Sequence, residues 1–197
     1  FQGVDYVLGA TGYDITKTWM PWAKEAGCIV VDNSSAFRLD KDVPLVIPEV
    51  NKEDIKGHHG LIANPNCATI IALVALQALH KKYRIKRMIV TTFQAVSGAG
   101  VQGIEDLKNQ IEDENVPSKA FPYQIAFNLI PQIGDFDDLG ISKDTTNQDL
   151  VHVGRIRKDI TDETNHTLSL FCCGDQIRKG AATNAVQILE ELLKAND

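Results

Sequence analysis

The chain has 197 residues, of which 44% are hydrophobic and 23% are charged, and these proportions are typical of a globular protein with one or two domains. Its net charge of -6 and its pI of about 5.3 provide no basic field that would attract nucleic acid or an anionic membrane. No apolar run approaches the roughly 18–20 residues of a membrane span. We therefore expect neither nucleic acid nor a membrane as a partner.

The chain opens with two apolar, β-branched runs on either side of a helical pattern. The pattern predicts a strand at 4–10, a helix at 12–27 and a strand at 28–35. Asp14 is expected to cap the helix and Gly27 to end it. A strand, a helix and a strand of this length form a parallel unit, so we expect an α/β fold with a parallel sheet.

Further elements follow along the chain. They are a buried helix at 67–83, a long strand at 85–96, a glycine loop, a helix at 104–114, strands at 149–160 and 166–174, and a closing helix at 179–197.

The four cysteines are Cys28, Cys67, Cys172 and Cys173, and no pair of them has the spacing of zinc ligands. Unpaired thiols are usual in the reducing cytosol, and no targeting segment is recognisable in the sequence. We expect a cytoplasmic protein without a metal site.

Cys67 stands where an apolar strand-like segment ends and an apolar helix begins. A helix N-terminus stabilises an anion by about 0.3–1 kcal/mol, or up to about 2 kcal/mol when partly buried, which lowers a thiol pKa by roughly one unit to about 7.5. Further activation needs a partner such as histidine, and the unpaired amides of the first turn can also bind an oxyanion. A small buried core residue explains the position equally well, so position alone leaves both interpretations open.

The segment "NPNCAT" follows "VVDNSSAFRLDKDVPLVIPEVN" and precedes "TTFQAVSGAG", and together they resemble aspartate-semialdehyde dehydrogenases. The resemblance continues in the family's order at "FPYQIAFNLIPQIGDF", "VGRIRKD" and "DQIRKGAATNAVQILE". N-acetyl-glutamyl-phosphate reductases have a similar layout but typically carry glycine where Asn66 stands, so the aspartate enzymes are the better match. The resemblance implies a partial Rossmann-like dinucleotide-binding domain at 1–63, joined by the closing helix at 176–197, and an α+β catalytic and dimerisation domain at 64–175.

Enzymes of this family reduce L-aspartyl 4-phosphate with NADPH, through a cysteine thioester, to L-aspartate 4-semialdehyde in the biosynthesis of lysine, threonine and methionine. The resemblance implies that Cys67 is the nucleophile, that Arg38 binds phosphate and that Gln94 positions the substrate. It implies four contacts to NADP, at Thr11, Ser97, Gly98 and Gln176. It also implies a homodimer or homotetramer.

Two amides and one glycine motif need separate interpretation. The resemblance implies that Asn66 holds the nicotinamide side or the oxyanion. Asn184 could face the cofactor, but we expect it to be a helix-surface amide. The motif "GAGVQG" at 98–103 fits G-x-G-x-x-G. A dinucleotide fingerprint would need a second strand ending in an acidic residue, and a loop-like segment follows instead, so we do not expect a fingerprint here.

The chain departs from the family at two places. The family's opening glycine-rich turn, which receives the cofactor's pyrophosphate, is not recognisable. Only "DDLGISKDTTNQDLVH" occupies the interval in which the family has a substrate-binding glutamate, a phosphate-binding lysine, a substrate-binding arginine and the catalytic histidine. None of the five histidines matches that pattern, so we expect this polypeptide alone to be a very weak catalyst. The alternatives are a longer chain with further segments, another phosphorylating dehydrogenase, and a non-catalytic relative that keeps the family's dimer surface.

Overall fold

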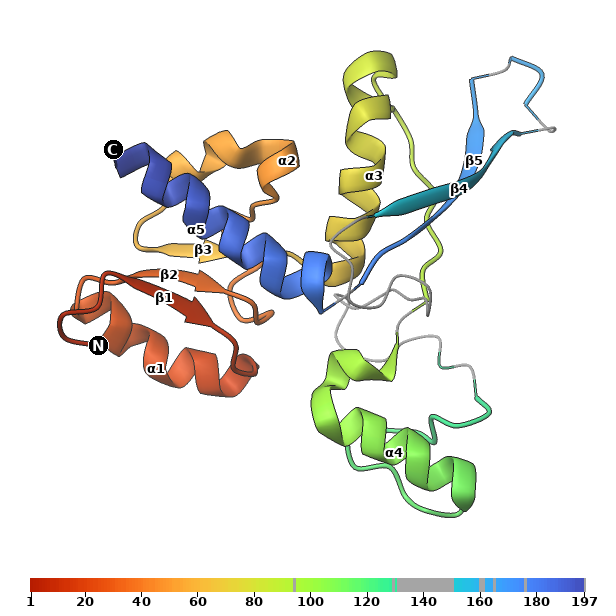
Figure 1. Cartoon of the computed structure of the whole chain (residues 1–197), viewed down its shortest axis with the longest axis horizontal. Helices are drawn as coiled ribbons and strands as arrows, with labels where there is room; N and C mark the ends of the chain where they lie inside the picture. The colour runs from red at the N-terminus through yellow and green to blue at the C-terminus, as the bar shows by residue number, and fades with distance from the viewer. Residues whose placement is uncertain are drawn as a thin grey trace.

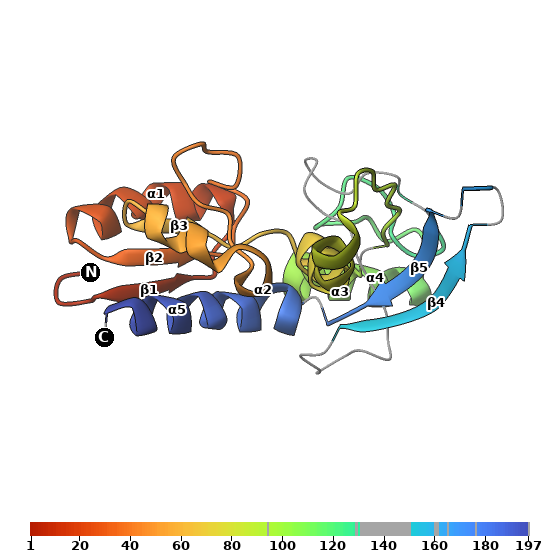
Figure 2. The same cartoon turned by 90° about the horizontal axis from the view of Figure 1, so that it is seen from above.

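The computed structural model describes residues 1–93, 95–128, 130, 151–159, 162–164, 166–175 and 177–196. A lobe built on a parallel sheet lies beside a second part that contains α3, α4 and an antiparallel ribbon (Figures 1 and 2). The predicted fold class, a Rossmann-like α/β domain with an additional α+β part, is confirmed.

The parallel sheet has the order β1-β2-β3. Strand β1 (Tyr6–Gly9) pairs with β2 (Ile29–Asp32), and β2 pairs with β3 (Leu61–Ala63). Helix α1 (Tyr13–Glu25) connects the first two strands and has Gly12 as its N-cap. The prediction that Asp14 caps this helix is therefore wrong, since Asp14 lies in its first turn. Gly27 follows the helix with a φ of +81°, a conformation that glycine adopts without strain.

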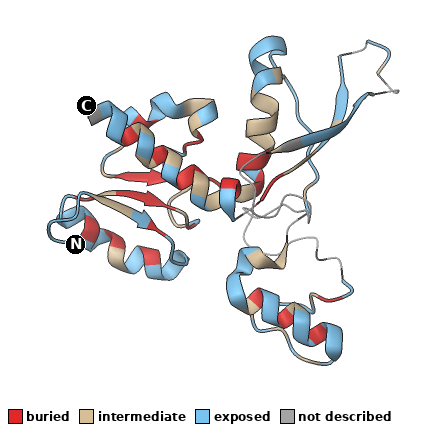
Figure 3. Cartoon of the chain, in the orientation of Figure 1, coloured by how far each residue is buried: buried red, intermediate tan, exposed pale blue. Residues whose placement is uncertain are grey.

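Successive residues of β2 point to opposite faces of the sheet, and each face is covered by helices. On one face Val30 packs in a cluster with Met20 and Ala23 of α1. On the other face Val31 packs with Ile188 and other apolar residues of α5 (Thr183–Asn196) and η1 (Lys52–Gly57). Figure 2 shows α1 and α5 on either side of the sheet, and Figure 3 shows the buried residues concentrated on the strands and the inner faces of these helices. The C-terminal helix thus completes the core of the first lobe.

The second part begins with α3 (Cys67–Tyr83), which follows β3 directly and confirms the predicted helix. The two late strands are also confirmed as β4 (His152–Lys158) and β5 (Leu168–Cys173), which pair antiparallel. The end of β5 packs on α3, because a Cβ added to Gly174 would lie 2.9 Å from Cγ1 of Ile71. The ribbon is therefore anchored beside the N-terminal half of α3.

Helix α4 (Gly100–Glu112) begins inside the predicted glycine loop, directly after the 3-10 turn η2 (Val96–Ala99). A Cβ on Gly103 would lie 2.5 Å from the carbonyl oxygen of Val96, so this glycine allows the turn to pack on the helix. The buried amide of Gln110 holds the returning segment through hydrogen bonds to four of its residues: Val116, Ser118, Ile125 and Ala126.

The predicted strand at 85–96 is wrong. Residues 84–93 have no regular backbone ladder, and the two strands described nearby, β4 and β5, pair with each other. The apolar side chains of residues 84–93 are largely exposed, including Ile89 at 82% and Phe93 at 60%. Apolar alternation favours a strand only where a second strand completes the hydrogen bonds, so the local pattern was insufficient here.

Candidate active site

The carboxyl ends of the three parallel strands meet at one edge of the sheet, which is where α/β proteins bind ligands. Thr11 follows β1, Asn33 follows β2 and Asn64 follows β3. Cys67 begins α3 only three residues after Asn64. The residues after β2 and β3 are joined, since Nδ2 of Asn64 donates to Oδ1 of Asn33 at 2.6 Å, and they lie next to the start of the helix that carries the candidate nucleophile.

Cys67 is partly buried and its position is fixed by the cap of α3. The side-chain oxygen Oδ1 of Asn66 accepts hydrogen bonds from the amides of Ala68 at 2.9 Å and Thr69 at 3.3 Å. The main-chain oxygen of Asn66 accepts from the amide of Ile70 at 3.0 Å. Asn66 is thus a helix cap, and the amides of residues 68–70 have acceptors, so these three amides are not unpaired as expected.

A π-helical turn, η4 (Arg178–Ala182), lies against Cys67 immediately before α5. Oδ1 of Asp175 accepts from the amides of Ile177 at 2.8 Å and Arg178 at 2.9 Å, which starts the turn. A Cβ added to Gly180 would lie only 2.7 Å from Cβ of Cys67. The main chain of the turn therefore touches the cysteine at a point where a side chain does not fit, and π-helical turns are frequent at functional sites.

Arg38 lies at the same edge of the sheet. Its Nε donates to the carbonyl oxygen of Asn64 at 3.1 Å and its terminal nitrogen donates to that of Asn33 at 3.0 Å. Burial raises the pKa of the neighbouring Asp32 carboxyl above its ordinary value, while hydrogen bonds from Ser34 and the charge of Arg38 oppose that rise. Arg38 and Cys67 are linked through the Asn64 segment, so the structure brings a cation close to the approach to α3.

Two buried residues at this edge were missed or misjudged from sequence. Asn184 is fully buried, and its Nδ2 donates to Oδ1 of Asn64 at 2.6 Å and to the carbonyl oxygen of Val46 at 3.1 Å. The expectation that Asn184 is a surface amide is wrong, because its partners lie 120 and 138 residues earlier in the chain. Lys179, 2% exposed, donates to Oδ1 of Asn184 at 3.0 Å. Gly180, Ala181 and Ala182 stand between Lys179 and Asn184, and small residues of this kind are the sequence signal of close main-chain packing.

The remaining predicted site residues lie in different places. Thr11 is exposed, and its hydroxyl oxygen is hydrogen-bonded to Thr16 at 2.8 Å and accepts from Nε1 of Trp19 at 2.9 Å. A Cβ at the neighbouring Gly12 would meet nothing within 4 Å. Ser97 and Gly98 lie in η2, which packs on α4 beyond the N-terminal end of α3 (Figure 1).

Gln94 and Gln176 lie outside the described residues. Within the described ranges, no three His, Cys, Asp or Glu residues are grouped so that they could hold a metal ion. In the same part of the chain, no helix is long and apolar enough to cross a membrane.

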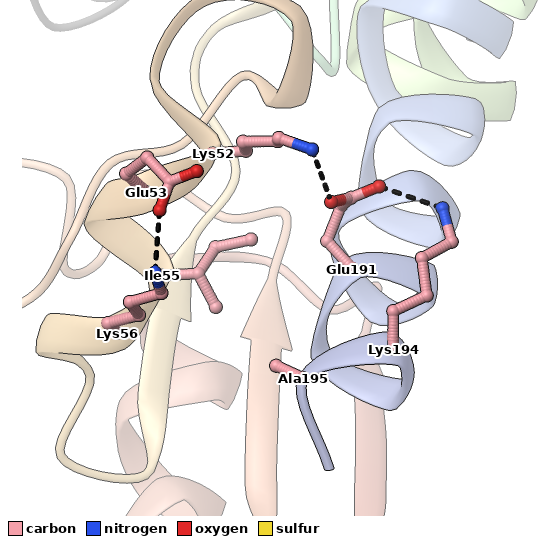
Figure 4. A pocket seen from close by; sticks show the side chains of 7 residues that line it. All are labelled: Lys52, Glu53, Ile55, Lys56, Glu191, Lys194 and Ala195. Carbon is pink, nitrogen blue, oxygen red and sulfur yellow. Dashed lines mark hydrogen bonds and ion pairs between the residues drawn. The ribbon is translucent and has the colours of Figure 1, made fainter. Parts of the chain in front are cut away.

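A shallow hollow lies away from Cys67, between η1 and the last turns of α5 (Figure 4). Its three lysines are paired with its two glutamates: Glu191 pairs with Lys52 at 3.1 Å and with Lys194 at 2.8 Å, and Glu53 pairs with Lys56 at 2.7 Å. Because α5 begins beside Cys67 and ends at this hollow, the hollow is separate from the candidate active site.

Comparisons with known proteins agree with this arrangement. Residues 1–58 match the model of the semialdehyde dehydrogenase NAD binding domain, and residues 76–143 match that of the semialdehyde dehydrogenase dimerisation domain. Aspartate-semialdehyde dehydrogenase of Aquifex aeolicus is 37% identical over an alignment that covers 98% of this chain and 81% of that enzyme. Aspartate-semialdehyde dehydrogenase of Bacillus subtilis is 34% identical over an alignment that covers 100% of this chain and 81% of that enzyme.

The alignment with the Aquifex aeolicus enzyme extends over 276 positions, whereas this chain has 197 residues. At least 79 positions of that relative therefore stand opposite gaps in this chain.

Solved structures show the same likeness. A crystal structure of aspartate semialdehyde dehydrogenase II from Vibrio cholerae, complexed with ASA, has a TM-score of 0.86 and 33% identity, covering 97% of this chain and 80% of that one. An aspartate semialdehyde dehydrogenase with NADP from Candida albicans, with a TM-score of 0.57 and 20% identity, covers 97% of this chain and 78% of that one and shares the fold. The parallel sheet carries a helix that begins with a cysteine at its carboxyl edge, two domain models match the sequence, and relatives are more than 30% identical over most of their length. The chain therefore belongs to the aspartate-semialdehyde dehydrogenase family.

Proposed function

We propose that this protein reduces L-aspartyl 4-phosphate to L-aspartate 4-semialdehyde, with Cys67 as nucleophile and NADPH as reductant. The observation that carries the proposal is the position of Cys67, which starts α3 at the carboxyl edge of a parallel sheet in a member of this family. The reaction would serve the biosynthesis of lysine, threonine and methionine, in the cytoplasm.

The residues of the site suit each part of this chemistry. The thiolate of Cys67 attacks the acyl carbon, and the bond from that carbon to the phosphate oxygen breaks with its electron pair on the phosphate. Arg38 is the proposed partner for the phosphate, because two of its nitrogens donate to carbonyl oxygens that hold it at the sheet edge and a guanidinium has five N–H groups suited to phosphate oxygens. Gln94 is proposed to position the substrate. When bound, NADPH would supply a hydride for the thioester carbon. Cys67 would then leave as the thiolate when the carbon–sulfur bond breaks and the aldehyde forms.

The match to an NAD binding domain model supports a nicotinamide dinucleotide as cofactor, and we assign it as NADP on the family's preference. Its contacts are proposed at four residues: Thr11, Ser97, Gly98 and Gln176. The exposed position of Thr11 and the absence of neighbours at the Cβ position of Gly12 support the first of them.

We also propose a division of the chain into a cofactor domain and a catalytic domain. Residues 1–63 and the closing helix at 176–197 form the first, and residues 64–175 form the second, which also pairs the subunits into a homodimer or homotetramer. The match to a dimerisation domain model at residues 76–143 supports this pairing.

A second candidate function is favoured by the internal gap in the alignment with the Aquifex aeolicus enzyme. The family's catalytic histidine belongs to the interval that is short here, and loss of a general acid–base typically costs about 10²–10⁴-fold in rate. The second candidate is therefore a relative that has lost catalysis and keeps the paired subunits.

One assay separates the two candidates. NADP reduction is measured with aspartate semialdehyde and phosphate for the parent chain, for Cys67→Ser and for the control Cys172→Ser, which removes a partly buried thiol from β5. The proposed enzyme shows weak turnover that Cys67→Ser abolishes and Cys172→Ser retains. Turnover that survives in Cys67→Ser contradicts the assigned nucleophile, and a dimer by sedimentation with no turnover in any variant supports the non-catalytic relative.

A further inference from the structure

Lys179 is an ammonium group enclosed within the protein. It is 2% exposed, and its Nζ lies 2.7 and 2.9 Å from the two carboxylate oxygens of Glu49. It also donates to Asn184 at 3.0 Å and to Oε1 of Gln187 at 2.6 Å. A buried charge is costly unless it is paired and fully hydrogen-bonded, so these partners hold the lysine to one geometry.

These partners come from elements on the sheet side of the site. Glu49 belongs to the short helix α2 (Pro48–Asn51), whereas Asn184 and Gln187 belong to α5. Lys179 itself lies in the π-helical turn. The lysine therefore ties this turn to α2 and to the first turns of α5.

Two connections lead from Lys179 to Cys67. The first is direct, since the next residue, Gly180, approaches Cys67 so closely that its ideal Cβ would lie 2.7 Å from Cβ and 3.2 Å from Cα of the cysteine. The second runs through Asn184, which accepts from Lys179 and donates to Oδ1 of Asn64 at 2.6 Å. Asn64 stands three residues before Cys67. Both the turn that covers the cysteine and the segment that leads to it are therefore connected to one ammonium group.

We propose that Lys179 is a positioning residue for Cys67: anchored by Glu49, it holds the π-helical turn against the cysteine and fixes the direction of its thiol. The inference rests on the proposed role of Cys67 as nucleophile. Misplacement of a reacting group by about 1 Å can lower a rate about 10²-fold, so an anchor that keeps Gly180 in contact with Cys67 acts on the reaction without touching the substrate.

The test uses the full chain and three variants. Lys179→Met removes the anchor, and the double variant Lys179→Met/Glu49→Gln also removes the carboxylate charge that would be left unpaired, which protects the fold. The matched control is Lys52→Met, because Lys52 also pairs with a glutamate but is 52% exposed and lies away from Cys67. Folding of each variant is followed by thermal unfolding.

The readout is the alkylation of Cys67, measured by mass spectrometry as the ratio of the rate for a bulky maleimide to the rate for iodoacetamide. Loosening the turn uncovers the thiol, so we expect this ratio to rise several-fold in both Lys179 variants and to stay unchanged in Lys52→Met. For enzyme that turns over, kcat should fall about tenfold to hundredfold with a smaller change in KM.

An unchanged alkylation ratio in the folded double variant overturns the inference, even if its thermal stability has changed. Should Lys179→Met fail to fold, the double variant decides. Absence of turnover in the parent chain would contradict the proposed function alone, because the alkylation ratio still reports whether Lys179 positions Cys67.

Discussion

Replacement of Gly180 by alanine tests the contact between the π-helical turn and Cys67. The added Cβ would lie 2.7 Å from Cβ of Cys67, whereas ordinary contacts begin at 3.4 Å. The two main chains must therefore separate by about 0.7 Å, and overpacking of this kind typically costs about 1–3 kcal/mol. Alanine recovers up to about 1 kcal/mol through its higher helix propensity. We expect the free energy of unfolding to fall by about 1–2 kcal/mol.

The same displacement should alter the reactivity of the thiol. Urea denaturation measures the stability of Gly180→Ala, and iodoacetamide labelling followed by mass spectrometry measures the alkylation rate of Cys67. Gly57→Ala is the control, because a Cβ at Gly57 meets nothing within 4 Å. If Gly180→Ala matches the parent in both stability and alkylation rate, the contact between Gly180 and Cys67 has no consequence and the prediction is wrong.

Three further predictions concern the cap, the second part of the chain and a buried carboxyl. Asn66→Ala should lower the free energy of unfolding by about 0.5–2 kcal/mol, because two amides of α3 lose their acceptor; an unchanged urea midpoint would contradict this. Gln110→Leu should cost about 1–3 kcal/mol for each buried amide left without an acceptor, whereas Leu at the exposed Asn109 should have little effect in the same assay. Burial raises the pKa of Asp32, so ionisation of this group opposes folding as the pH rises above the unfolded value. The stability of Asp32→Asn relative to the parent should therefore increase as the pH rises from about 3 to about 7. A stability difference that does not depend on pH would contradict this.

Local sequence patterns were sufficient for the elements that build the parallel sheet. The β-branched runs and the helix between them predicted β1, α1 and β2, because each pattern matches the environment that the element meets in the fold. The strand predicted at 85–96 failed because a strand depends on a partner, which no local pattern supplies. The pattern also predicts Cys67 at the start of α3, since a strand-like apolar segment and an apolar helical run meet at this residue. The capping role of Asn66 is seen only in the structure.

The polar network around the cysteine could not be predicted from local patterns. Lys179 and Asn184 stand at the start of an amphipathic helix, where charged and amide side chains are usually exposed. Their burial depends on Glu49 and Asn64, which lie 130 and 120 residues earlier in the chain. These contacts join segments that are distant in the sequence, so they become visible only in the folded chain.

The backbone between α3 and η2 has a consequence for limited proteolysis. Arg84, Lys86 and Arg87 are exposed, and they lie where the chain makes no regular ladder, which is the kind of segment that proteases cut first. Trypsin should nick the protein there into two fragments. Because α5 of the later fragment shares a hydrophobic cluster with β2 and β3 of the earlier one, the nicked molecule should elute as one species on a sizing column and separate only in denaturant.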